Sequence, residues 1–325
     1  MHQYHRPRRL RCQPWIRDLV RENAISPQDL IWPIFVREGE NIEEPISSLP
    51  GVSRLSIDKA VEAAQFACDL GIPVIALFPY TDPAKRTSDG AEAFNPDNLV
   101  NRATRAIKKA VPNIGIMLDV ALDPYSDHGH DGIMVDGYID NDLTIDALVK
   151  QSLVQVEAGA DILGPSDMMD GRIGAIRDML EFTENKNTLI MAYSAKFASG
   201  YYGPFRDAVG ASGTLKGDKK TYQMDPANGS EALNMIERDL AEGADMVMVK
   251  PGMPYLDVCA RAADQFRAPI FAYQVSGEYA MIENAIRAGL FDEDQITLES
   301  MLAFKRAGCA GVLTYFAPRI AKLVG

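Results

Sequence analysis

The chain has 325 residues and carries 33 basic against 45 acidic side chains, a formal net charge of −12. This acidic balance argues against a nucleic-acid-binding protein, which would show a basic surface. No apolar run is long enough for a transmembrane helix, and no apolar segment of a secretory signal follows the basic start, MHQYHRPRRLR. We therefore expect a cytoplasmic protein with neither nucleic acid nor membrane as a partner.

The four cysteines, Cys12, Cys68, Cys259 and Cys309, form no C-x-x-C pair. This spacing argues against a structural zinc site or a redox motif. Isolated cysteines in a chain of this size are typical of reduced thiols in the cytoplasm.

Residues 1–30 show no sheet pattern and contain the basic segment, so we interpret them as an N-terminal arm. The arm's arginines fit one of two roles: they bind an acidic surface of a neighbouring subunit, or they are simply solvated. The four arginines are Arg6, Arg8, Arg9 and Arg11.

From residue 31 onward, short apolar runs alternate with segments of helical spacing. The runs predict eight strands, at 31–36, 74–78, 114–119, 161–166, 188–193, 245–250, 269–275 and 311–315. The helical segments are 57–70, 95–110, 144–158, 171–182, 230–242 (capped by Ser230), 255–266, 278–288 and 298–307, with a short helix at the end. Two long stretches have neither pattern: an insertion at 120–142 and a polar, glycine-rich loop at 207–227.

A glycine recurs where a helix passes into the next strand, at Gly71, Gly159, Gly243 and Gly308. Glycine supplies the left-handed residue just beyond a helix. Eight such βα units predict a (β/α)8 TIM barrel over residues 31–325, preceded by the arm at 1–30. A doubly wound sheet is the alternative, but no G-x-G-x-x-G follows the first or second strand.

Lys250 ends the sixth apolar run, directly before Pro251 and Gly252. The carboxyl ends of barrel strands carry the catalytic side chains. A lysine at an apolar rim has its ammonium form disfavoured, and a neutral amine can attack a ketone to form a Schiff base. The structural alternative is a lysine that reaches solvent or pairs with a carboxylate.

Other polar residues gather at the same predicted strand ends: Asp119, Ser166, Ser194, Lys196, Ser276 and Tyr315. Lys196 and Lys250 follow adjacent strands, and like charges a few ångströms apart lower each other's pKa. Two lysines so placed favour a catalytic site over a purely structural role.

Four motifs carry a resemblance that runs from about residue 6 to the C-terminus. They are VKPGMP (249–254), MAYSAKFAS (191–199), PSDMMDGR (165–172) and YGPFR (202–206). These long motifs, in the order in which they occur along the chain, resemble those of the 5-aminolevulinate dehydratases, also called porphobilinogen synthases. The resemblance implies a lyase that condenses two molecules of 5-aminolevulinate to porphobilinogen, with loss of two waters, in tetrapyrrole (heme) biosynthesis. It also implies a homo-oligomer, an octamer or a smaller ring such as a hexamer, assembled through the arm.

The resemblance further implies a role for each site residue. Lys250 would hold the first substrate (the P-side) as a Schiff base, and Lys196 would hold the second (the A-side). Asp119 and Ser166 would act in proton transfer and positioning. The P-side carboxylate would be bound by Ser276 and Tyr315, and the A-side substrate by Phe205, Arg206, Lys219 and Gln223.

The loop at 119–132 aligns with the metal loop of the family, where zinc-dependent relatives carry three cysteines. This chain has Ala121, Asp123 and Asp131 in those places. Thiolates select zinc, whereas carboxylates suit harder ions such as Mg²⁺. We therefore expect no zinc and no required cofactor. The alternatives for Asp123 and Asp131 are that they bind Mg²⁺ through water or that they belong to a solvated lid. At the position of the glutamate that holds an allosteric Mg²⁺ in some relatives, the alignment puts Met235, with Arg238 one turn on.

Two other functions remain open. A class I aldolase also uses a Schiff base in a barrel, but it needs only one lysine. A non-catalytic barrel that serves as a scaffold would have no need for the polar set at the strand ends.

Overall fold

The computed structural model describes residues 5–210, 213 and 215–325. Eight parallel strands form a closed barrel, because the last strand pairs with the first. The barrel strands are β1 (Leu30–Val36), β4 (Val74–Pro79), β5 (Gly115–Val120), β8 (Ile162–Pro165), β9 (Leu189–Lys196), β10 (Met246–Lys250), β11 (Ile270–Gln274) and β12 (Gly311–Thr314). The predicted (β/α)8 architecture is confirmed.

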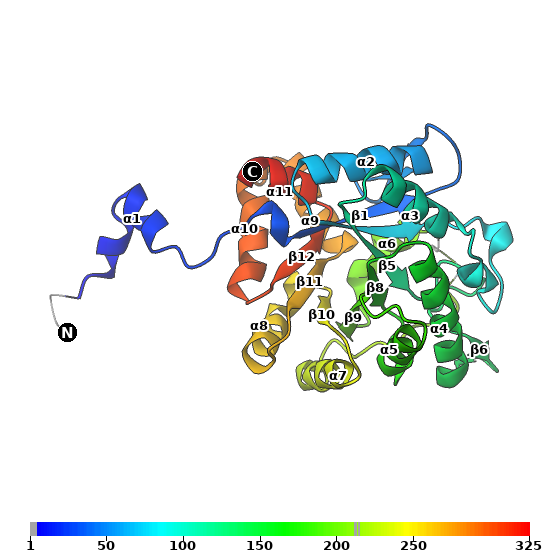
Figure 1. Cartoon of the computed structure of the whole chain (residues 1–325). Helices are drawn as coiled ribbons and strands as arrows, with labels where there is room; N and C mark the ends of the chain where they lie inside the picture. Colours follow the sequence, from blue (N-terminus) through cyan, green and yellow to red (C-terminus); the bar gives the residue numbers. More distant parts are fainter. Residues whose placement is uncertain (1–4, 211–212, 214) are drawn as a thin grey trace.

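Helices surround this barrel (Figure 1) and bury the outer faces of its strands, which explains why the strands read as continuous apolar runs. They are α2 (Ile57–Asp69), α3 (Leu99–Ala110), α4 (Asn141–Glu157), α5 (Arg172–Phe182), α7 (Gly229–Ala241), α8 (Leu256–Gln265), α9 (Ser276–Arg287), α10 (Glu293–Arg306) and α11 (Ala317–Val324). A short helix, α6 (Gly203–Ala208), follows β9 after one turn of 3₁₀ helix. The predicted glycine junctions are confirmed, since Gly71, Gly159, Gly243 and Gly308 have φ between +76° and +105°.

The sequence reading differs from the structure in several places. Strand β9 runs three residues beyond its apolar part, to Lys196, because those residues still pair with β10. Helix α10 begins five residues earlier than its apolar spacing suggests, where Asp292 caps it by accepting from the Gln295 N–H. Ser230 is not the cap of α7, because the helix already begins at Gly229.

The short strands outside the barrel were also not predicted from the sequence. The insertion at 120–142 contains a hairpin of β6 (Met134–Val135) and β7 (Tyr138–Ile139). Strands β2 (Glu43–Pro45) and β3 (Ser53–Leu55) extend the sheet beside β1. Segments of two or three residues carry too little periodicity to be recognised in a sequence.

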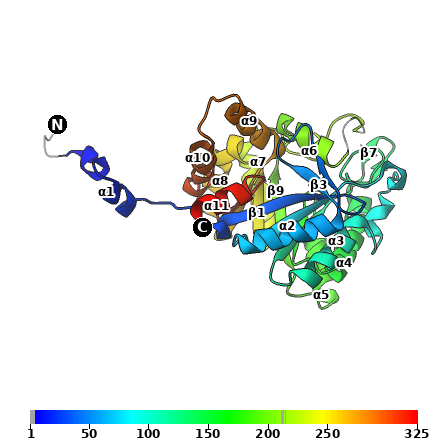
Figure 2. The ribbon, with the colours of Figure 1, turned by 90° about the horizontal axis from the view of Figure 1, so that it is seen from above.

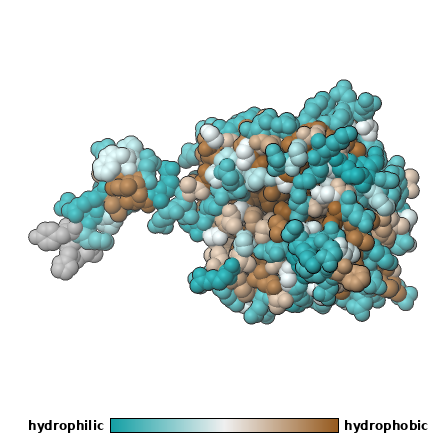
Figure 3. Space-filling view, in the orientation of Figure 1, coloured by the Kyte–Doolittle hydropathy of each residue, from teal (hydrophilic) through white to brown (hydrophobic). Residues whose placement is uncertain are grey.

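The N-terminal arm projects away from the barrel (Figures 1 and 2). It contains a 3₁₀ turn at Pro7–Arg11 and the short helix α1 (Pro14–Leu19), neither of which has a buried residue. Several apolar side chains of the arm are exposed, and they form an apolar patch on its surface (Figure 3). None of the helices within the described residues is long and apolar enough to cross a membrane.

Candidate active site

The two lysines singled out in the sequence end neighbouring strands of the barrel. Lys196 is the last residue of β9 and Lys250 the last of β10, and the two are directly paired in the sheet register. The two residues are only 5% and 6% exposed, so both amines are held inside the protein. Both strand-end positions agree with the prediction from sequence.

One cavity at this end of the barrel brings most of the predicted site together. Eight of the ten predicted site residues line it: Asp119, Ser166, Lys196, Phe205, Arg206, Lys219, Gln223 and Lys250. Asp123 and Tyr202 complete the wall. Phe205 and Arg206 come from α6, which lies over the strand ends, and its position brings residues distant in sequence to the two lysines.

Lys250 lies in an aromatic cage. Its Nζ is 4.9 Å from the ring centroid of Tyr193, 5.5 Å from Tyr202, 5.1 Å from Phe205 and 4.8 Å from Tyr273. Burial, reinforced by the charge of Lys196, lowers the pKa of Lys250 to about 7. A large fraction of this amine is therefore neutral near neutral pH and available as a nucleophile.

The amine of Lys196 is bound in a different way. Its Nζ donates to the Asp131 carboxylate at 3.1 Å and also to the backbone carbonyl of Ser166. Asp131 is 1% exposed, and it also accepts from Lys219 Nζ at 2.7 Å and from the Tyr222 hydroxyl at 2.9 Å. Burial alone would raise the pKa of Asp131, but the two ammonium groups outweigh it and hold that pKa well below its usual range.

This network differs from what the sequence suggested for Asp131, which was considered as a metal ligand or a solvated lid residue. The solvated alternative is wrong, because Asp131 is the buried counter-ion of both Lys196 and Lys219. Tyr222 was not predicted at all. The need for a buried carboxylate such as Asp131 could have been predicted, because two lysines directed into one cavity require a negative charge nearby.

Asp119, near the end of β5, is the second buried carboxylate of the site. Burial raises the pKa of Asp119 to about 6, against the opposing effect of Lys250. Its Oδ1 is buried and has no hydrogen-bond partner among the described residues. The strand end is held by Gln155, whose Nε2 donates to the Asp119 backbone carbonyl at 2.9 Å. A carboxylate with a free oxygen beside two amines is suited to accept a proton from a bound substrate.

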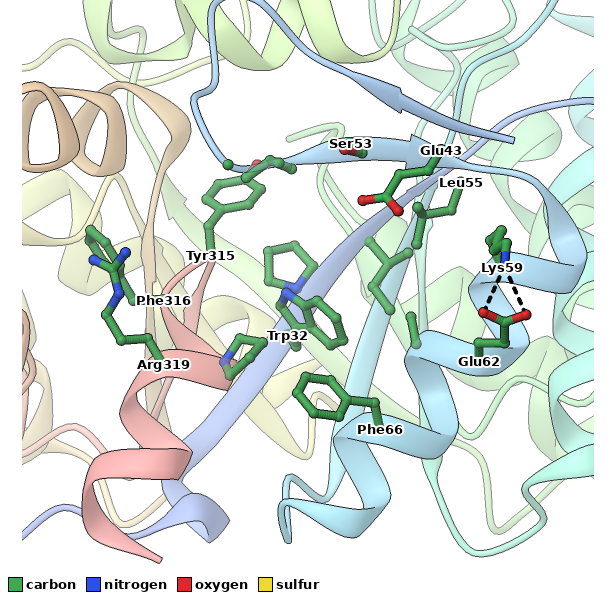
Figure 4. Close-up of a pocket in the computed structure, with 16 residues that line it drawn as sticks. Trp32, Glu43, Ser53, Leu55, Lys59, Glu62, Phe66, Tyr315, Phe316 and Arg319 are labelled. Atoms are coloured by element: carbon green, nitrogen blue, oxygen red, sulfur yellow. Dashed lines mark hydrogen bonds and ion pairs between the residues drawn. The ribbon is translucent and has the colours of Figure 1, made fainter. Parts of the chain in front are cut away.

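Ser276 and Tyr315, the predicted P-side carboxylate ligands, do not line this cavity. Ser276 Oγ accepts from the Phe205 backbone N–H at 2.9 Å. The Tyr315 hydroxyl bonds that of Tyr273 at 2.9 Å, and its ring borders a separate groove beside Trp32 (Figure 4). Ser276 therefore contacts Phe205, and Tyr315 contacts Tyr273, which are two of the aromatic residues around Lys250.

Comparison with known proteins decides the family. The model of the delta-aminolevulinic acid dehydratase family matches residues 4–323. The chain belongs to the delta-aminolevulinic acid dehydratase family.

Relatives within this family are similar over nearly the whole chain. The dehydratase of Bradyrhizobium diazoefficiens is 60% identical over 317 residues, which cover 98% of this chain and 90% of the relative. That of Rhodobacter capsulatus is 56% identical, over 99% of this chain and 97% of the relative. The crystal structure of the Toxoplasma gondii dehydratase, in complex with the reaction product porphobilinogen, is 47% identical with a TM-score of 0.96. It is matched over 98% of this chain and 91% of that one.

Proposed function

We propose that this cavity condenses two molecules of 5-aminolevulinate to porphobilinogen, with loss of two waters, in tetrapyrrole biosynthesis. The observation that carries the proposal is the pair of buried lysines, in register on β9 and β10, that line one cavity. Membership of the dehydratase family and the product complex of the Toxoplasma gondii relative support it. A class I aldolase would leave the second lysine without a role.

In this mechanism each lysine holds one substrate. The neutral amine of Lys250 attacks the ketone of the first 5-aminolevulinate, and loss of water leaves a protonated imine. The iminium withdraws electrons and acidifies the adjacent carbon, from which Asp119 accepts a proton. Lys196 binds the second substrate in the same way, once its ammonium group has transferred a proton to the hydrogen-bonded Asp131 carboxylate.

The substrate carboxylates require positive or hydrogen-bonding groups. For the second substrate we assign Arg206, Lys219 and Gln223, because all three line the cavity and Lys219 shares the Asp131 carboxylate with Lys196. An arginine binds a carboxylate through two parallel hydrogen bonds. For the first substrate we assign Ser276 and Tyr315, and Ser276 is joined to the cavity wall through its hydrogen bond with the backbone N–H of Phe205.

Chemical trapping tests the imine. Incubation with 5-aminolevulinate and borohydride is expected to add the mass of one reduced substrate to the peptide that contains Lys250. The ion-paired Lys196 is expected to be labelled more slowly. Mass spectrometry of the digested protein measures both, and labels confined to lysines outside the cavity would contradict the assignment.

We also propose that the enzyme needs no divalent metal. Zinc does not fit the site, because the four cysteines are absent from the cavity wall and the side chain of Ala121 has no ligand atom. The Lys219 ammonium lies 3.5 Å from Asp123 and 2.7 Å from Asp131, so a cation already bridges the two carboxylates that could hold Mg²⁺.

The position of the family's allosteric ion supports the same proposal. Arg238 is bound there to Asp170 and lies 3.4 Å from Asp239 and 3.6 Å from Glu242. Met235, on the same helix, offers no oxygen ligand. A guanidinium is a fixed charge that a chelator cannot remove.

Activity is therefore expected to survive exhaustive dialysis against EDTA. Turnover is measured before and after dialysis, and then during titration with Mg²⁺, Zn²⁺ and K⁺. If activity is lost and Mg²⁺ restores it, the alternative with Asp123 and Asp131 as ligands is correct. In that case Asp123→Ala should abolish the recovery.

We further propose that the chain assembles through its arm into a homo-oligomer, an octamer or a hexamer. The exposed apolar residues of the arm, Leu10, Trp15, Leu19 and Val20, support this assembly, since an apolar segment free in water is unfavourable. Deleting residues 1–24, the part of the predicted arm (1–30) that precedes the buried Pro27, is expected to lower the assembly state and the activity together. Sedimentation measures the assembly state, and a fully active full-length monomer would refute the proposal.

We also propose that the protein is located in the cytoplasm. The four cysteines are all free, which suits a reducing compartment. The relatives from Bradyrhizobium and Rhodobacter are bacterial, whereas plant relatives such as that of Glycine max are named chloroplastic.

A further inference from the structure

Glu278 is a fully buried carboxylate for which the proposed chemistry has no use. It lies in the first turn of α9 and has 0% exposure. Burial raises the pKa of Glu278 to about 7, and the groups that oppose this shift are three backbone N–H donors. A buried carboxylate with no cationic partner is costly unless hydrogen bonds compensate for the lost water.

The three donors come from two separate turns. Gly252 N–H donates to Oε2 at 3.1 Å and Met253 N–H to Oε1 at 2.6 Å. Val275 N–H donates to Oε2 at 2.8 Å. Gly252 and Met253 lie in the turn that follows Lys250 and Pro251, whereas Val275 follows β11. One side chain therefore joins the turn after the lysine to the end of the next strand.

The turn after Lys250 is also restricted from its other side. A Cβ at Gly252 would lie 2.6 Å from the ring of Phe304, so the backbone there is packed against that ring. The start of α9 is equally close to its neighbours, because a Cβ at Gly277 would lie 2.4 Å from the Tyr201 carbonyl. The turn is thus packed between Phe304 and Glu278, and the start of α9 is packed against the backbone of Tyr201.

We propose that Glu278 is a positioning residue that fixes the turn after Lys250 to the start of α9, and so keeps the amine inside its aromatic cage and next to Lys196. The inference rests on the proposed imine at Lys250. Without the carboxylate, three buried N–H groups lose their acceptor, and the backbone next to the nucleophile is free to move. A displacement of about 1 Å at a reacting group can lower a rate about 10²-fold.

The test compares two isosteric substitutions on α9. Glu278→Gln places an amide NH₂ against at least one of the backbone donors. Glu283→Gln is the matched control, because Glu283 is also buried (6% exposed) but pairs with Arg287 and Arg319, away from the turn. Single-turnover borohydride trapping measures the rate and the pH midpoint of imine formation at Lys250. Thermal unfolding of each variant measures stability.

We expect Glu278→Gln to slow imine formation about 10²-fold and to shift its pH midpoint upward, towards that of an exposed lysine, while Glu283→Gln changes neither. A folded Glu278→Gln variant that traps at the unmodified rate and midpoint would overturn the inference, even if its stability had fallen. Absence of trapping in the unmodified protein would instead count against the proposed imine. Should Glu278→Gln fail to fold, hydrogen exchange of the unmodified protein decides. Strong protection of the Gly252, Met253 and Val275 amides is expected, and rapid exchange at them would overturn the inference.

Discussion

Lys250→Met is expected to lower kcat by at least about 10⁴-fold, as removal of a covalent nucleophile does. Methionine has a similar length and a thioether that packs well against aromatic rings. The four rings around Lys250 should therefore accept it, and the substitution also removes a buried amine that burial destabilises as a cation. The loss of activity is expected in a folded protein, with no imine trapped at position 250.

The pH dependence of imine formation in the unmodified enzyme provides a second test of the Lys250 amine. Only the neutral form attacks, and the neutral fraction rises as the pH rises through about 7, the lowered pKa of Lys250. Imine formation should therefore accelerate between about pH 6 and pH 8 and then level off. Lys109→Met, at an exposed position on α3, serves as the control that leaves rate and profile unchanged. A midpoint near that of an ordinary lysine would contradict the role of burial.

The fold and the nucleophiles could be predicted because their signals are local. An apolar run that stops at a charged residue before Pro-Gly indicates a buried strand and its end, and a glycine after each helix marks the next unit. Lys250 was found in this way. Lys196 was found from its place just beyond the fifth apolar run, because β9 was predicted three residues too short. Its last residues are polar, and only their pairing with β10 keeps them in the strand.

The partners of the site could not be predicted, because they depend on how distant segments approach one another. Asp131 and Tyr222 are 91 residues apart in the chain, yet they share a hydrogen bond beside Lys196. Nothing in the sequence around Glu278 indicates that its carboxylate reaches back to the turn at Gly252. Ser276 and Tyr315 were expected at strand ends and received their role as carboxylate ligands by resemblance, but neither lines the cavity.

Lys196→Met is expected to lower kcat/KM by about 10²- to 10⁴-fold while imine formation at Lys250 continues. The second substrate would lose its covalent attachment, but the first amine would keep its cage. The fold should tolerate the change, because Asp131 keeps its bonds to Lys219 and Tyr222 and is not left as an unpaired buried charge. Borohydride trapping at Lys250, compared with steady-state turnover, separates the two effects.

Lys196→Arg distinguishes the nucleophile from the charge. A guanidinium is always protonated and cannot form an imine, but it can still pair with Asp131. If Lys196 holds the second substrate covalently, the arginine variant should be as inactive as the methionine variant, with trapping at Lys250 intact in both. Substantial turnover by the arginine variant would mean that Lys196 contributes only its positive charge. The second substrate would then react as a free ketone, held in place by Arg206 and Lys219.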